Sequence, residues 1–112
     1  MNEIKLSKKT IIELTINDIE CIATLDNLAI DHFQRSNKKG LLEAFEELKN
    51  YNMTTIIQLL GSCIREKKTG KILGYNYFKD YDTLDIINSL MPVLEGLFPD
   101  NMPIASSKTE KK

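Results

Sequence analysis

IIELTINDIECIAT, residues 11–24, is the stretch that decides the fold of this chain. Apolar and polar residues alternate on both sides of Asn17-Asp18, and this period of two is typical of strands with one buried face. Asn and Asp tolerate positive φ, so the pair predicts a two-residue turn that closes a β-hairpin. The residues expected on the buried face are Ile12, Leu14, Ile16, Ile19, Cys21 and Ala23, and those expected to face outward are Glu13, Thr15, Glu20 and Thr24.

An isolated hairpin is marginal in water, so helices must cover its apolar face. Apolar residues at helical spacing predict four helices, at about residues 27–36, 41–49, 54–67 and 83–98. Asp26 and Asp82 are suited to cap the first and the last of them, and Thr54 or Thr55 the third. Residues 72–81, which hold three of the four tyrosines, fit either an extended loop packed by its rings or a short helix.

The apolar faces of these elements predict one hydrophobic core. In the second helix the residues expected to face inward are Leu41, Leu42, Ala44, Phe45 and Leu48. The residues expected to be largely buried in one cluster are Ile12, Leu14, Leu28, Phe33, Phe45, Leu48, Ile56, Leu60 and Ile64.

The length of 112 residues suits one domain with one core. We therefore expect an α+β fold, an N-terminal β-hairpin packed on about four helices, over residues 10–103. Residues 1–9 are expected to be flexible, and residues 104–112 to form a disordered tail. No apolar run approaches the roughly 20 residues of a membrane span, and no signal peptide is recognisable. Cys21 and Cys63 lie in apolar settings, which predicts buried free thiols in a reducing, cytoplasmic compartment.

Charge is unevenly distributed along the chain. The net charge is −1, yet residues 1–10 and residues 104–112 each carry three lysines and one glutamate, so the segment between them is acidic. A nucleic-acid reader needs a basic face on its folded part. We therefore expect basic, solvated tails on an acidic body, with no nucleic-acid partner and no membrane partner.

Residues suited to catalysis are sparse. His32 is the only histidine, and its helical position predicts a packed side chain with one ring nitrogen bonded. Two cysteines and one histidine do not make a structural zinc site, and the glycines form no phosphate-binding pattern. The sequence predicts a protein that is not an enzyme and uses no cofactor or metal.

The last predicted helix carries an unusually wide apolar face. Its apolar residues cover roughly half of the helix circumference, whereas a helix covering one core shows a stripe on the order of 100°. Either the helix is sunk between two others, or part of the face binds a partner or another copy of the chain. Pro92 falls on the opposite, polar face. The candidate protein-binding residues are Leu90, Met91, Leu94, Leu97 and Phe98.

Three segments carry a resemblance to a known family. They are IELTINDIECIATLDNLAIDHF (residues 12–33), LLEAFEELKNYNMTTIIQLLGSCIRE (residues 41–66) and YDTLDIINSLMPVLEGLF (residues 81–98). In element order and apolar pattern the chain resembles the tail assembly chaperones of long-tailed phages, and of related prophages, of Gram-positive bacteria. The likeness spans roughly residues 10–100 and leaves residues 75–81 unassigned.

The resemblance implies a non-enzymatic chaperone that coats the tape measure protein before the tail tube polymerises. Such a protein acts in the bacterial cytoplasm and is absent from the mature virion. The family also implies a longer product made by frameshifting, which binds tail tube subunits. Lys111-Lys112 would permit an adenine-rich slippery run in the gene. The alternative function is a small DNA-binding or antitoxin-like regulator of a mobile element, which would use residues 53–71, where a helix ends in a basic cluster.

Overall fold

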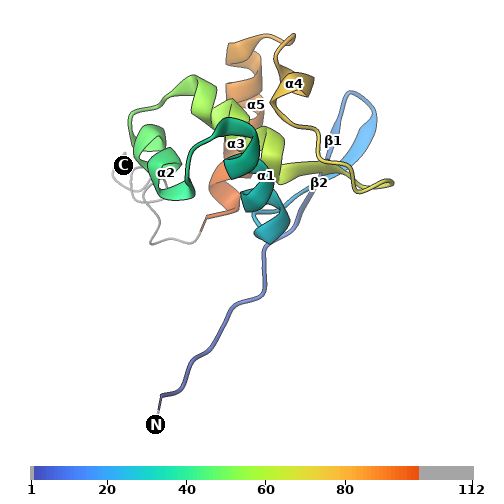
Figure 1. Cartoon of the computed structure of the whole chain (residues 1–112). Helices are drawn as coiled ribbons and strands as arrows, with labels where there is room; N and C mark the ends of the chain where they lie inside the picture. The colour runs from blue at the N-terminus through green and yellow to red at the C-terminus, as the bar shows by residue number, and fades with distance from the viewer. Residues whose placement is uncertain (1, 99–112) are drawn as a thin grey trace, which may run out of the picture.

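The structure is a computed structural model, and it describes residues 2–98. The expected tail at residues 104–112, and with it the lysine pair of the frameshift hypothesis, lies outside the described residues. The elements are β1 (Ile12–Ile16), β2 (Ile19–Ala23), α1 (Asn27–Asn37), α2 (Leu41–Lys49), α3 (Met53–Cys63), β3 (Ile64–Glu66), α4 (Tyr75–Phe78) and α5 (Thr83–Gly96). The α+β class is confirmed, with the helices gathered beside a small sheet (Figure 1).

The hairpin forms as the alternation predicts. Ile16 pairs with Ile19 across a turn in which Asn17 and Asp18 have φ of 46° and 71°, the two positive values that a type I′ turn requires. Glu13, Thr15 and Glu20 are exposed, while Cys21 and Ala23 are buried. Thr24 was expected to face outward and is instead buried. It lies beside the chain that enters β1, and its hydroxyl donates to the Thr10 carbonyl at 2.8 Å.

A third strand replaces the end of the third predicted helix. The expected helix reached about residue 67, but α3 ends at Cys63 and the chain continues as β3, antiparallel to β2. The sheet order is therefore β1-β2-β3. Pairing with β2 gives the backbone N–H and C=O groups of residues 64–66 the partners that a continued helix would have supplied. At the start of this pairing the Thr24 N–H donates to the Cys63 carbonyl at 3.0 Å. The N-cap of α3 is Asn52, whose side chain accepts from the Thr55 N–H, and neither Thr54 nor Thr55 serves as the cap.

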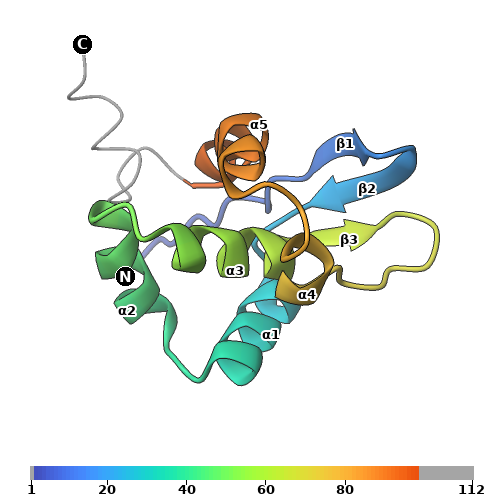
Figure 2. The same ribbon diagram turned by 90° about the horizontal axis from the view of Figure 1, so that it is seen from above.

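Helix α3 is the centre of the molecule. Most of its residues from Thr55 onward are buried, and it contacts α1, α2, α4, α5 and β3 (Figure 2). It crosses the segment before α4 at Gly61, where the Gly74 N–H donates to the Gly61 carbonyl at 2.9 Å. This close crossing places α4, the short helix that was one of two expectations for residues 72–81.

The core follows the prediction with two clear errors. Six of the expected residues are buried: Phe33, Phe45, Leu48, Ile56, Leu60 and Ile64. Ile12 and Leu14 are half-buried against the same cluster. Leu28 is 51% exposed, because Ala29 and Phe33 set the buried face of α1 and Leu28 lies beside it. Leu42, expected to face inward, is 80% exposed.

Helix α5 begins as predicted and ends earlier. Asp82 caps it by accepting from the Asp85 N–H at 3.0 Å. The last helical residue is Gly96, so Leu97 and Phe98 follow the helix instead of completing it. Pro92 is exposed, as its predicted position on the polar face requires. The Cβ that an alanine would add at Gly96 lies 3.1 Å from Ile12 Cδ1, which shows how closely the end of α5 approaches the start of β1.

Candidate protein-binding site

A groove of about 270 Å³ lies where the tip of the hairpin meets α4 and the first half of α5. Its apolar lining comes from Ile16, Tyr77, Phe78, Tyr81, Ile86 and Leu90, and its polar lining from Thr15, Asn17, Asp85 and Ser89. Pockets for whole small molecules are usually larger, on the order of 300–1,000 Å³. The groove is therefore suited to one large apolar side chain of a protein partner, of the kind that anchors interfaces.

Aromatic rings build one wall of the groove. Tyr77 packs edge-on against Phe78 at a centroid distance of 5.1 Å and lies 5.7 Å from the ring of Tyr81. Burial, together with a hydrogen bond to Tyr81, raises the pKa of Tyr77 above its ordinary value. The phenol therefore stays neutral at physiological pH, and the wall offers apolar ring surface with hydroxyl groups that can donate or accept hydrogen bonds.

The rim of the groove combines an exposed aromatic ring with an acidic side chain. Tyr81, which lines the groove, is 47% exposed, and the lining residue Asp85 is exposed as well. From Asp80 to Phe98 the chain carries Asp80, Asp82, Asp85 and Glu95 and no lysine or arginine. A partner that combines apolar residues with lysine or arginine would complement this rim.

The five residues predicted from the sequence occupy different environments. Leu90 lines the groove and is half-buried. Met91 is half-buried and packs against the core. The other three lie inside the core cluster: Leu94, Leu97 and Phe98. Only Leu90 of the five therefore belongs to the groove, which also includes residues that the prediction missed. The sequence signal that could have identified the aromatic wall is the concentration of tyrosines in residues 75–81.

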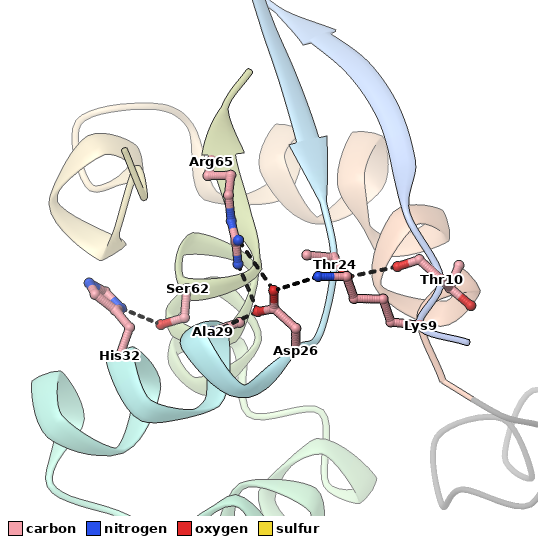
Figure 3. Close-up of polar contacts among 8 residues, drawn as sticks. All are labelled: Lys9, Thr10, Thr24, Asp26, Ala29, His32, Ser62 and Arg65. Carbon is pink, nitrogen blue, oxygen red and sulfur yellow. Dashed lines mark hydrogen bonds and ion pairs between the residues drawn. The ribbon is translucent and has the colours of Figure 1, made fainter. Parts of the chain in front are cut away.

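A polar cluster ties α1 to the sheet (Figure 3). The Asp26 carboxylate accepts from Arg65 Nη2 at 2.8 Å, from the Ala29 N–H at 3.0 Å and from Lys9 Nζ at 3.3 Å. Burial by itself would raise the pKa of Asp26, but the hydrogen bonds from Arg65 and Ala29 outweigh it and lower the pKa to about 2. Asp26 thus caps α1 and ties it to β3 and to the N-terminal segment.

The lone histidine is half-buried as expected, but both of its ring nitrogens have a partner, because Nε2 lies 3.5 Å from the Ser36 hydroxyl. His32 Nδ1 lies 2.8 Å from the Ser62 hydroxyl, and Ser62 is buried in α3 (Figure 3). The pair joins α1 to α3. A serine nucleophile must be reachable by substrate, and the buried hydroxyl of Ser62 is not.

Both cysteines are buried free thiols. Burial, with a smaller contribution from the negative charge of Asp26, raises the pKa of Cys63 to about 12. Burial likewise raises the pKa of the Cys21 thiol. Neither side chain is ionised at physiological pH, so both act as small core residues rather than nucleophiles.

The basic cluster proposed for DNA binding is divided by the third strand. Arg65 points to Asp26 with only 12% of its side chain exposed, and Lys67 lies 3.5 Å from Glu13. Lys68 and Lys71 remain exposed in the loop after β3. A recognition helix must present a free face to the major groove, and α3 is instead surrounded by the other helices. From Thr55 onward α3 is mostly buried and offers no such face.

Within residues 2–98 no group of histidine, cysteine, aspartate and glutamate side chains is arranged to hold a metal ion. In the same part of the chain no helix has the length and apolar character needed to cross a membrane. When the chain was compared with protein-family models, with curated proteins and with solved structures, none of them matched it.

Proposed function

We propose that this chain is a tail assembly chaperone of the long-tailed phage type, which binds the tape measure protein in the bacterial cytoplasm and is absent from the mature virion. The proposal rests on the resemblance in residues 12–33, 41–66 and 81–98. The observation that supports a binding site is the groove between the hairpin tip, α4 and α5, with its aromatic wall and the exposed ring of Tyr81 at its rim.

The groove matches what such a partner offers. A tape measure protein is a long helical chain, and before the tube forms around it, its apolar side chains would be exposed to water. One large side chain of an amphipathic helix would occupy the groove, while a neighbouring apolar residue rests on the exposed ring of Tyr81. Lysine or arginine residues on the flanks of that helix would lie near Asp82 and Asp85.

Weak individual contacts are sufficient in this setting. A groove for one anchor side chain buries little area, so a single copy would bind with low affinity. Many copies along one filament gain avidity because each contact reinforces the next. In the same proposal, a longer frameshifted product carries the contact with tail tube subunits.

Co-expression tests this function. The chain would be expressed with the tape measure protein of the same phage or prophage, and the soluble fraction of that protein measured. We expect the wild-type chain to keep the tape measure protein soluble. Tyr81→Ala and Leu90→Asp should reduce the soluble complex at least tenfold, because they remove the rim and place a charge in the groove.

The matched control is Leu42→Asp, which introduces the same charge at a side chain that is 80% exposed on α2. It should bind like the wild type. Circular dichroism would establish that each variant is folded. A tape measure protein that stays insoluble with the wild-type chain would overturn the function, and equal binding by the groove variants and Leu42→Asp would overturn the site.

A further inference from the structure

The two edges of the sheet differ in how their backbone groups are satisfied. Beyond β3 the chain folds back, so that Glu66 N–H donates to the Lys71 carbonyl at 2.8 Å and Leu73 N–H to the Ile64 carbonyl at 3.0 Å. β1 forms the opposite edge and pairs with β2 alone (Figure 2). One edge is therefore covered by the chain itself, and the edge at β1 is open within residues 2–98.

The register identifies which groups of β1 face this open edge. In a hairpin with a two-residue turn the flanking residues, here Ile16 and Ile19, exchange hydrogen bonds, and bonded pairs then alternate with non-bonded ones. The next bonded pair is Leu14 with Cys21. The N–H and C=O groups of Glu13 and Thr15 therefore point away from β2.

The bonds between β2 and β3 agree with this assignment. The Glu20 carbonyl accepts from Lys67 N–H at 2.9 Å, so Glu20 directs its backbone toward β3. Its partner in β1, Thr15, correspondingly directs its own backbone outward. Among residues 2–98 these outward N–H and C=O groups of Glu13 and Thr15 have no hydrogen-bond partner.

The open edge lacks three of the features that most often block strand pairing. Natural edge strands carry a lysine, a proline or a bulge that prevents pairing with another strand. Residues 12–16 contain no lysine or proline, and their register with β2 is continuous. The one charged residue is Glu13, whose carboxylate lies 3.5 Å from Lys67 of the same chain. This edge is suited to pairing.

We propose that β1 pairs antiparallel with β1 of a second copy of the chain, joining the two sheets into one. The strand Ile-Glu-Leu-Thr-Ile is self-complementary about Leu14. With Leu14 opposite itself, Glu13 lies opposite Thr15 of the second copy, and each outward N–H and C=O group of both residues gains a partner. Ile12 and Ile16 also face each other across the junction, so the apolar face continues from one sheet to the next.

Charge disfavours the neighbouring register that is centred on Glu13. Pairing centred on Glu13 would place two carboxylates opposite each other, which destabilises a strand pair. Pairing centred on Leu14 avoids that contact and forms an isologous interface, in which the same surface is used by both copies. The groove shares Thr15 and Ile16 with this strand, so the proposed dimer contact and the groove are adjacent. The dimer does not depend on the proposed function.

A proline at the open edge tests the proposal. Thr15→Pro removes one outward N–H, which makes no hydrogen bond within the described chain, and proline is tolerated at such edge positions. Thr15→Val is the matched control, because it keeps the N–H and a β-branched side chain. In sedimentation velocity over a concentration series, we expect the wild type and Thr15→Val to form a dimer. Thr15→Pro should raise the dimer dissociation constant at least tenfold.

Amide hydrogen exchange on the wild-type chain provides a test that needs no variant. Exchange at the Glu13 and Thr15 amides should slow as concentration rises through the dimer range, while the Leu14 amide, bonded within the hairpin, should change little. The proposal is overturned by a wild-type chain that stays monomeric at millimolar concentration. It is equally overturned by a dimer that Thr15→Pro leaves intact, or by Glu13 and Thr15 amides whose exchange does not depend on concentration.

Discussion

Asp26 shows how one side chain can connect several parts of the fold. Its oxygens cap α1, accept from Arg65 of β3 and lie within 3.3 Å of Lys9 before β1. Replacing a capping residue usually costs about 1 kcal/mol, and leaving Arg65 without its partner adds to that because its side chain is mostly buried. We therefore expect Asp26 to contribute more to stability than the exposed ion pair of Arg35 with Asp31.

The pH dependence of stability tests the role of Asp26. Its pKa falls from 3.8 to about 2 on folding, so its contribution is complete above about pH 4 and is lost as the pH falls toward 2. With 14% of the side chain exposed, this contribution is at most about 2 kcal/mol. Asp26→Asn keeps a capping side chain and loses the charge. We expect urea unfolding to show it less stable than the wild type at pH 6, with the difference shrinking toward pH 2.

Asp82→Asn is the matched control, because Asp82 caps α5 at an exposed site. At pH 6 it should lose less stability than Asp26→Asn, because Asp82 caps its helix without an ion pair among residues 2–98. A difference between Asp26→Asn and the wild type that stays constant down to pH 2 would contradict the ion-pair explanation.

At the scale of elements, the position of α4 depends on a contact between two backbones. Gly61 in α3 faces Gly74, and both residues are glycine for steric reasons. A Cβ on Gly61 would lie 2.5 Å from the Gly74 carbonyl carbon, and Gly74 has φ of +79°. Only glycine adopts that φ without strain. The aromatic wall of the groove follows directly after this crossing, so the crossing also positions the candidate site.

Gly61→Ala tests this contact. In an exposed helix the change would stabilise by up to about 1 kcal/mol, but here the new methyl group must displace backbone. We expect a net loss of about 1–3 kcal/mol in the free energy of unfolding, measured by urea denaturation. Gly40→Ser is the control, because a Cβ at Gly40 meets nothing within 4 Å and serine suits the N-cap of α2. Equal stability of Gly61→Ala and the wild type would contradict the close crossing.

At the scale of the whole molecule, residues far apart in the sequence close the core around α3. Phe45 of α2 packs edge-to-face on Phe98, which follows α5, at a centroid distance of 5.4 Å. Ile12 of β1 contacts the end of α5 near Gly96. Through these contacts α2, α5 and the sheet belong to one cooperative unit.

Removing the Phe45 ring therefore tests the packing of the whole domain. Phe45→Ala should lower the free energy of unfolding by about 3–5 kcal/mol, because Phe45 is buried and its loss leaves a cavity beside Phe98. That loss is large compared with the stability of a small domain. Thermal melts would measure it. Leu42→Ala, in the same helix at an exposed position, should leave the melting temperature nearly unchanged, and a similar loss in both variants would contradict the placement of α2.

The sequence by itself determined the local features of this protein. The Asn17-Asp18 turn, the alternation of the hairpin, and the caps Asp26 and Asp82 each depend on residues close together in the chain. Such signals can be read without knowing where the rest of the molecule lies. For the candidate site this local information identified Leu90, on the apolar face of the last helix.

Only the tertiary structure decided the features that depend on residues far apart in the sequence. Residues 64–66 continue a helical pattern, yet they form β3 because the free side of β2 is adjacent and supplies hydrogen bonds. Leu28 is exposed because α3 meets the Ala29 and Phe33 side of α1. The groove exists only because the hairpin tip, α4 and α5 converge on it. Burial and strand pairing depend on three-dimensional neighbours, and neither apolar spacing nor turn chemistry specifies which neighbours those are.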